Sequence, residues 1–320
     1  MKLISIVIPV YNEEPSIGIF LDEFLKFRNT LHFGNYSFEL LFVDDGSTDD
    51  TPVILHKIID ANPFVRALVF SRNFGKEAAL FAGLEAASGT VVIPMDVDLQ
   101  DPFHVIPAML EKYGQGADVV LAKRTDRGSD SFLKRFSARW FYRFNNKMSS
   151  VKLEENVGDF RLMSRQVVDE VVRLHENQLF MKGMMSWVGF KTEIVSYRRE
   201  ERRGGSSKFN YRRLWNLALQ GITSFSTIPL KVWIYFGSVT AVISFLYGIK
   251  IIIEKVFFGI SVSGYASLMV AILFFGGVQL IGIGVLGEYL GRTYLETKRR
   301  PKYIVKQILK NERDPEPHNR

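Results

Sequence analysis

The sequence predicts an α/β domain with a doubly wound, Rossmann-like and mainly parallel sheet, followed by interfacial helices and a two-helix transmembrane hairpin. In the first hundred residues, apolar runs rich in β-branched residues alternate four times with segments of helical character. This alternation is typical of a parallel sheet. Nearer the C-terminus, two apolar runs each exceed the ~20 residues that a helix needs to cross a bilayer.

Each predicted strand is short, apolar and followed by a turn or a helix. The four strands are expected at residues 4–9, 38–43, 65–70 and, for the fourth, from Val91 onward. Gly46 permits the turn after the second strand, and Ser47, Thr48 or Asp49 can cap the helix that follows. Three of the strands end in acidic or polar side chains. Open α/β sheets bind their ligands at this edge, so we expect a site there.

The fourth strand runs into two carboxylates and an amide at alternate positions, Asp96, Asp98 and Gln100. In an extended chain these side chains point to one side, with neighbours about 6 to 7 Å apart. A row of oxygen atoms suits a hard divalent cation, Mg²⁺ or Mn²⁺. The alternative is a plain acidic turn, since Asp101 before Pro102 is common turn chemistry.

The two apolar runs predict membrane helices at about 231–254 and 264–288. Basic residues flank the pair on its outer ends but not at the turn between them, so the positive-inside rule places both termini in the cytoplasm. The absence of cysteine agrees with a cytoplasmic location. The expected units are a soluble domain at 1–210, an interfacial helix or linker at 211–228, the hairpin at 229–292 and a cytoplasmic tail at 293–320.

The glycine motif typical of dinucleotide-binding sites does not follow any of the predicted strands. A formal G-x-G-x-x-G lies at 282–287, inside the second apolar run, where small residues favour close helix packing, including packing between subunits. We therefore reject dinucleotide binding there. No phosphate-binding glycine loop follows the first strand. A nucleotide at the sheet edge would need its phosphates neutralised by a metal or by Arg and Lys.

Residues 131–147 combine basic residues with aromatic residues at helical spacing. This pattern indicates an amphipathic helix lying on a membrane surface. An ordinary helix with a solvated face is the alternative. Aromatic residues among arginines also suit single-stranded nucleic acid, but the two spans downstream favour the lipid bilayer, so we expect no nucleic-acid partner.

Several of these segments together resemble glycosyltransferase family 2 enzymes with a GT-A fold. Within that family the sequence is most similar to polyprenyl-phosphate glycosyltransferases, namely dolichol-phosphate mannose synthases and bactoprenol glucosyltransferases of the GtrB kind. The similarity extends over nearly the whole chain, including the two-helix tail. The segments that carry it are IPVYNEE (8–14), VDDGSTD (43–49), SRNFGK (71–76), MDVDLQDP (95–102), DFRLMSR (159–165) and RRGGSSK (202–208).

The resemblance implies sugar transfer, with inversion, from a nucleotide sugar to a polyprenyl phosphate such as undecaprenyl phosphate at the cytoplasmic membrane face. UDP-glucose is the favoured donor, with GDP-mannose and a UDP-aminosugar as alternatives. On this resemblance Asp96 contacts the nucleotide and helps to hold Mg²⁺ or Mn²⁺, with Asp98 and Gln100 as further ligands. The base and ribose would be lined by Pro9, Tyr11, Glu13 and Asp44. For Asp44 and Asp45 a helix-capping turn is the alternative, and Asp45 can serve both roles.

The remaining candidates carry charge near the expected phosphates. Arg124 and Arg139 are candidates for gripping the acceptor phosphate, because arginine offers a bidentate fork. Asp159 and Arg161 are expected after a loop and before a helix around 167–174. They could form a capping or surface ion pair, but the resemblance favours a place at the reacting centre, where Asp159 would orient the sugar or the attacking phosphate.

The loop at 198–208, with Arg203 and Lys208, could close over the donor phosphates or simply link the domain to the membrane.

Two other functions compete with this one. A processive polysaccharide synthase would carry a Q-x-x-R-W motif and more spans, and the sequence has neither. A membrane-anchored nucleotide-binding or scaffold protein without catalysis would not need three oxygen-bearing side chains in one row.

Overall fold

The computed structural model describes residues 2–30, 36–125, 154, 156–174, 176, 179–198, 228–258 and 264–311. Within this part of the chain, eight strands form one sheet in the order β7-β5-β6-β4-β1-β2-β3-β8. The strands are β1 (Lys2–Val10), β2 (Tyr36–Asp44), β3 (Val65–Phe70), β4 (Val91–Pro94), β5 (Val119–Arg124), β6 (Val157–Ser164), β7 (Thr192–Tyr197) and β8 (Val305–Leu309).

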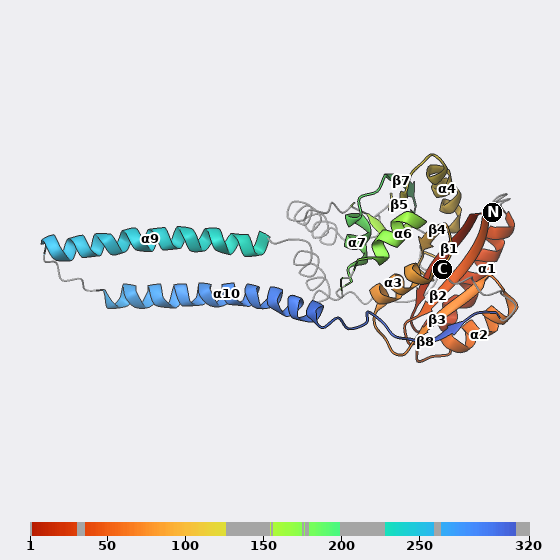
Figure 1. Ribbon diagram of the computed structural model, residues 1–320, viewed down its shortest axis with the longest axis horizontal. Helices are drawn as coiled ribbons and strands as arrows, with labels where there is room; N and C mark the ends of the chain where they lie inside the picture. Colours follow the sequence, from red (N-terminus) through yellow and green to blue (C-terminus); the bar gives the residue numbers. More distant parts are fainter. Residues whose placement is uncertain are drawn as a thin grey trace.

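Helices cover both faces of this sheet (Figure 1). The helices of the domain are α1 (Glu14–Thr30), α2 (Thr51–Ala61), α3 (Lys76–Ala86), the 3-10 turn η1 (Phe103–Val105), α4 (Ile106–Gly114), α6 (Arg165–Val172) and α7 (Met181–Trp187). Alternate residues of β1 face opposite cores: Ile6 packs with Phe20 and Phe24 of α1, whereas Val7 packs with Ala79 and Ala82 of α3. The doubly wound α/β architecture is therefore confirmed.

The centre of the sheet is parallel, as predicted. Strand β1 pairs in parallel with both β2 and β4, and β2 pairs in parallel with β3. The register places Val10 beside Asp44 and Val7 beside Pro94. The loops that follow β1, β2 and β4 consequently leave the sheet at one edge, where the sequence predicts a site.

Strand β6 differs from the prediction. It runs antiparallel between β4 and β5 and contains Asp159 and Arg161, which the sequence placed after a loop. Charged residues inside a strand resemble loop residues when the sequence is read alone. Phe160 and Leu162 face one core, and Val157 and Met163 face the other. The strand also pairs on both of its edges, so it lies inside the sheet.

Strand β8 was not predicted either. It follows the apolar hairpin and pairs antiparallel with β3, so part of the C-terminal segment expected at 293–320 returns to the sheet. The connection is anchored just before β8. The ring of Tyr303 stacks on Phe70 with centroids 5.0 Å apart, the backbone N–H of Ser71 donates to Ile304 O at 2.9 Å, and Lys302 Nζ donates to Leu174 O at 2.7 Å.

Two long helices, α9 (Ile228–Phe258) and α10 (Tyr265–Thr297), extend side by side away from the sheet (Figure 1). Their apolar stretches, Leu230–Glu254 and Ser267–Thr297, are long and apolar enough to cross a membrane. Gly282 lies against the Trp233 ring of α9, where a Cβ would come within 3.2 Å, which supports the helix-packing interpretation of the glycines. The expected helices at 131–147 and 211–228 lie largely outside the described residues.

Candidate functional site

The loop after β1 is tied to the loop after β2. The backbone N–H of Asn12 donates to Ser47 Oγ at 2.9 Å, and Thr48 N–H donates to Asn12 Oδ1 at 2.8 Å. Glu13 N–H donates to Thr51 Oγ1 at 3.0 Å. These contacts fix the segment that carries Pro9, Tyr11 and Glu13, and they leave Tyr11 45% exposed at the rim.

The acidic pair at the end of β2, Asp44 and Asp45, is buried. Both oxygens of Asp45 accept from the backbone N–H groups of Phe74 and Gly75 at 2.6 to 3.1 Å, which holds the turn into α3. Asp44 Oδ1 accepts from the hydroxyl and N–H of Ser47 at 2.5 and 3.0 Å, whereas Asp44 Oδ2 has no partner. Burial raises the pKa of both carboxyls, although these hydrogen bonds oppose the rise.

Asp45 therefore fixes the loop that leads into α3 and does not form the expected helix cap, and Asp44 keeps one oxygen without a protein partner. Gly46 makes the turn between them and the next helix, with φ at +70° and the backbone of Arg72 against the position of a Cβ. The turn predicted at Gly46 is confirmed. Helix α2 starts at Thr51, where Asp49 Oδ1 accepts from the N–H of Thr51 at 3.1 Å.

The expected straight row of Asp96, Asp98 and Gln100 is wrong in its geometry. Strand β4 ends at Pro94, and the chain turns at Leu99, whose φ is +56°. Asp98 Oδ1 accepts from Gln100 N–H at 3.2 Å, which closes the turn. Asp96 and Asp98 stay partly exposed, whereas Gln100 is 5% exposed and its Oε1 has no partner.

A lysine joins the acidic turn to the neighbouring strand. Lys76 Nζ lies 2.6 Å from Asp96 Oδ1 and 3.1 Å from Asp159 Oδ2. The ammonium thus links the first turn of α3, the end of β4 and the middle of β6. The SRNFGK segment is part of the sequence resemblance, but the sequence alone does not place Lys76 in the site. Its signal was its place at the start of a helix that follows a strand of the parallel sheet.

The charges around Asp159 favour its ionised form. Burial opposes ionisation, but the ammonium groups of Lys76 and Lys182 outweigh it and lower the pKa of Asp159. Burial likewise disfavours the charge on Lys76, yet Asp96 and Asp159 raise the pKa of that ammonium. The second carboxylate oxygen of Asp159, Oδ1, is buried and has no hydrogen-bond partner. It is an acceptor available to a ligand hydroxyl.

Arg124 lies at the end of β5, where its guanidinium is held within the domain. Nε donates to the Tyr197 hydroxyl at 3.1 Å, and Nη2 lies 3.7 Å from Asp101 Oδ1. The Tyr197 hydroxyl in turn donates to Asp101. Burial opposes the positive charge, but Tyr197 and Asp101 raise the pKa of Arg124. The gripping of an acceptor phosphate by Arg124 stays a prediction.

Arg161 is 3% exposed on β6. Its Nη2 donates to Gly158 O at 3.0 Å, and its Nε has no partner. Burial lowers the pKa of the guanidinium, an effect that Asp159 opposes, and arginine remains charged in proteins. The other candidates, Arg139, Arg203 and Lys208, lie outside the described residues.

The oxygen atoms at the end of β4 fit a hard divalent cation in part. No group of three His, Cys, Asp or Glu side chains in the described ranges is placed to hold an ion. Asp96 and Asp98 nevertheless supply two carboxylates, and Gln100 adds an unpartnered buried oxygen. Mg²⁺ commonly binds one or two carboxylates and completes its shell with water and substrate phosphates. The residues therefore fit an ion that arrives with a phosphorylated ligand.

The fold and this edge define an α/β protein with an acidic, lysine-bridged ligand site and an apolar C-terminal hairpin. Residues 5–172 match glycosyl transferase family 2, and residues 228–293 match the GtrB C-terminal hairpin. The chain belongs to glycosyltransferase family 2 and is a glycosyltransferase.

Curated relatives match over nearly the full length. The prophage bactoprenol glucosyl transferase homolog of Escherichia coli (strain K12) is 56% identical over 96% of this chain and 99% of its own length. The bactoprenol glucosyl transferase of Shigella phage SfV is 58% identical over 95% of this chain and 98% of its own. The SfII prophage-derived bactoprenol glucosyl transferase of Shigella flexneri is 58% identical over 95% and 97%.

Proposed function

We propose that the protein transfers glucose from UDP-glucose to a polyprenyl phosphate, with inversion, at the cytoplasmic surface of a membrane. The observation that carries this proposal is the 56–58% identity to bactoprenol glucosyl transferases over at least 95% of the chain. That identity includes the hairpin as well as the sheet domain. The geometry at the sheet edge supports the same chemistry. Lys76, Asp96 and Asp159 lie together there, and Asp159 Oδ1 has no partner and can accept a hydrogen bond from a sugar hydroxyl.

The donor would bind across the carboxyl ends of β1, β2 and β4. Pro9, Tyr11 and Glu13 would line the base and ribose together with the free oxygen of Asp44. Asp96, Asp98 and Gln100 would hold Mg²⁺ or Mn²⁺ against the diphosphate, and such an ion stabilises the charge that develops on the leaving nucleotide.

Lys76 lies within 3.1 Å of both Asp96 and Asp159, so its ammonium can move toward the diphosphate when the donor binds. Positive charge next to the leaving phosphate stabilises the transition state. Lys76 would then contribute to the departure of the nucleotide, in addition to holding the two carboxylates in place.

Asp159 would orient the sugar. The sequence left open whether it acts on the sugar or on the attacking phosphate. Its unpartnered Oδ1 is a carboxylate oxygen, and its lowered pKa keeps it charged. A sugar hydroxyl can donate a hydrogen bond to it, whereas an acceptor phosphate would be repelled by it. The phosphate monoester is largely ionised near neutral pH, since its second pKa is about 6, and it needs positioning more than a general base.

The apolar helices α9 and α10 would anchor the enzyme in the membrane, with the sheet domain and both termini in the cytoplasm. Strand β8 supports this arrangement, because the chain that leaves α10 rejoins the sheet that precedes α9. The sheet domain and the segment after the hairpin therefore lie on one side of the two spans. Arg139 in the expected surface helix, and Arg203 and Lys208 in the expected loop, would bind phosphates at that surface.

Transfer of a labelled sugar into an organic-extractable lipid tests the proposal. The purified full-length protein is incubated with undecaprenyl phosphate and, in parallel, with UDP-glucose, GDP-mannose or a UDP-aminosugar, with Mg²⁺, Mn²⁺ or a chelator. We expect a lipid product from UDP-glucose that is lost with the chelator. A product from GDP-mannose alone would contradict the donor assignment, and no product from any donor would contradict the function.

A further inference from the structure

Glu77 is a partly buried carboxylate beside the candidate site that takes no part in the proposed reaction. It follows Lys76 in the first turn of α3, and its Oε2 accepts the backbone N–H of Met181 at 2.7 Å. Met181 is the first residue of α7. The bond therefore joins the starts of two helices whose residues are 104 positions apart in the sequence.

This bond is a polar attachment of the short helix α7 to α3. The first N–H groups of a helix have no acceptor within the helix, and Phe180, at the N-cap of α7, makes no side-chain capping bond. Glu77 supplies one of the missing acceptors. Apolar contacts complete the joint, because Met181 is fully buried and shares a core with Ala78 and Phe81 of α3. Glu77 thus fixes where α7 begins relative to α3.

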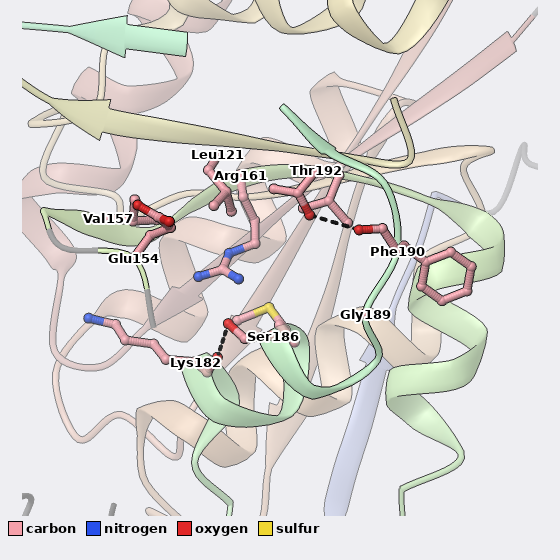
Figure 2. Close-up of a pocket in the computed structure, with 11 residues that line it drawn as sticks. Leu121, Glu154, Val157, Arg161, Lys182, Ser186, Gly189, Phe190 and Thr192 are labelled. Carbon is pink, nitrogen blue, oxygen red and sulfur yellow. Dashed lines mark hydrogen bonds between the residues drawn. The ribbon is translucent and has the colours of Figure 1, made fainter. Parts of the chain in front are cut away.

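The position of α7 determines the position of Lys182, the residue that follows Met181. Lys182 lines a cavity of about 200 Å³ together with Arg161 of β6. Figure 2 shows the Arg161 guanidinium pointing into the space between β6 and α7, on the side where Lys182 lies. Because this space adjoins the Lys182 side chain, close packing does not hold the ammonium in place. Its location depends on the helix that carries it.

Lys182 contributes to the charge balance around Asp159. Burial raises the pKa of Asp159, and the ammonium groups of Lys76 and Lys182 lower it. Among the described residues, Lys76 alone lies within 4 Å of the Asp159 carboxylate, at 3.1 Å. Lys182 therefore acts over a longer distance, and that distance is set by α7 and not by a bond to the carboxylate.

The charge of Glu77 does not explain why a carboxylate stands here. Burial raises the pKa of Glu77, the N–H of Met181 lowers it, and the charge of Asp159 raises it again, against Lys182 and Lys76. Two neighbouring carboxylates disfavour the ionisation of each other. The negative charge of Glu77 thus opposes an ionised Asp159, whereas its hydrogen bond keeps a cation near it. The charged side chains around the two carboxylates are Lys76, Arg161, Lys182 and, across Lys76, Asp96.

We propose that Glu77 is a positioning residue that fixes α7 through its bond to Met181 and thereby holds Lys182 near Asp159 for sugar transfer. The inference rests on the proposed function, in which Asp159 orients the sugar, and deepens it. Adjacent residues of α3 then act on Asp159 by different routes, Lys76 through an ion pair and Glu77 through the backbone of α7.

A matched pair of substitutions separates the hydrogen bond of Glu77 from its charge. Glu77→Gln removes the charge and keeps a side-chain oxygen that can accept from Met181, whereas Glu77→Leu removes both. Glu85→Leu is the control, because Glu85 is an exposed residue of α3 that is also hydrogen-bonded, to Tyr303. The pH profile of kcat/KM for UDP-glucose is measured for each full-length variant, for Lys182→Met and for the double variant Glu77→Leu/Lys182→Met.

We expect the acid limb of kcat/KM to lie about half to one pH unit higher in Glu77→Leu than in Glu77→Gln, because a displaced Lys182 no longer lowers the pKa of Asp159. At a pH on that limb the difference is about three- to tenfold in rate. Lys182→Met should move the limb in the same direction, and the double variant should move it no further to higher pH. Glu85→Leu should keep the wild-type profile.

A variant with a shorter side chain covers the case in which Glu77→Leu does not fold. Glu77→Asp keeps the charge, but its carboxylate falls short of the Met181 N–H. Its acid limb should therefore lie above that of the wild-type protein. Loss of stability alone would lower the melting temperature and leave the acid limb where it is.

Coincident acid limbs in Glu77→Leu and Glu77→Gln would overturn the inference, as would a further shift to higher pH when Glu77→Leu is added to Lys182→Met. Failure of the proposed function has a separate signature, which is the absence of transfer by the wild-type protein. The pKa of Asp159, followed by carbon-13 NMR of its carboxylate, then gives the same comparison without catalysis. A higher value in Glu77→Leu than in Glu77→Gln supports the positioning of Lys182, and equal values contradict it.

Discussion

Two acidic pairs lie at the same edge of the sheet and are used differently. Asp44 is the last residue of β2 and Asp45 follows it, and Asp96 and Asp98 follow β4. The first pair is buried, and three of its four oxygens accept hydrogen bonds from the protein itself. The second pair is partly exposed, and Asp96 forms an ion pair with the ammonium of Lys76.

The difference shows that carboxylates at strand ends do not all act on ligands. A carboxylate that accepts backbone N–H groups shapes a loop, and its removal leaves buried donors unsatisfied. A carboxylate facing solvent and a lysine side chain costs little to remove from the fold, yet it is free to meet a metal or a phosphate. Substitutions should therefore separate activity from stability between the two pairs.

The largest expected effect is on activity at the second pair. Asp96→Asn should lower kcat/KM by about 100-fold or more, because charge that stabilises the transition state through the bound metal is lost. The melting temperature should stay the same. Steady-state transfer to polyprenyl phosphate and thermal unfolding measure the two effects.

Asp50→Asn is the matched control for this substitution. Asp50 is exposed at the same edge of the sheet and makes no side-chain capping bond. It should retain full activity. Equal losses in the two variants would show that general surface charge, not the position of Asp96, sets the rate.

At the first pair the main effect should be on stability. Asp45→Ala leaves the N–H groups of Phe74 and Gly75 without their acceptor, which should lower the free energy of unfolding by about 2 to 3 kcal/mol. Chemical denaturation monitored by circular dichroism gives this value. Asp45→Asn, which keeps one acceptor oxygen, should lose less. A stability equal to wild type in Asp45→Ala would remove the distinction between the pairs.

The Lys76→Met variant tests the second pair through the pH dependence of kcat/KM. The pKa of Asp159 is low because Lys76 and Lys182 outweigh burial and the nearby carboxylate of Glu77. Without Lys76 that pKa should rise, so the acid limb of the kcat/KM profile should move to higher pH. We also expect kcat/KM on the neutral plateau to fall about tenfold.

Lys182 and Arg161 are the remaining cations near Asp159 and are unchanged in this variant. Lys57→Met, on the exposed side of α2, provides the control and should keep the wild-type profile. An acid limb at the same pH in Lys76→Met would show that Asp159 does not need its ionised form for transfer.

The smallest effect is expected for the hydrogen bond between Tyr303 and Glu85, which is remote from the acidic pairs. The Tyr303 hydroxyl donates to Glu85 near the C-terminal end of α3. Because this bond is exposed, Tyr303→Phe should change the free energy of unfolding by less than about 1 kcal/mol and leave transfer unaffected. Replacing the ring by alanine removes the stacking on Phe70 as well, so Tyr303→Ala should be the more destabilised of the two. An activity loss in Tyr303→Phe would show coupling between β8 and the site.

Much of the sheet could be predicted because its central strands are buried. The apolar run at 65–70 coincides with β3, and the other three predicted strands are present with slightly different bounds. Strands β6 and β8 could not be predicted in the same way. Asp159 and Arg161 interrupt the apolar pattern of β6, and the charge of Asp159 is offset by Lys76 and Lys182 from helices elsewhere in the chain. Strand β8 pairs with β3 although more than 230 residues separate them in sequence.

The sequence by itself determined the class of fold, the edge where the site lies, the apolar hairpin and the family, because these follow from local periodicity and contiguous motifs. Only the tertiary structure decided that Lys76 bridges Asp96 and Asp159, that Asp45 supports a turn, and that Arg161 faces a cavity. Each of these depends on which distant side chains share a buried space, and local sequence does not specify that.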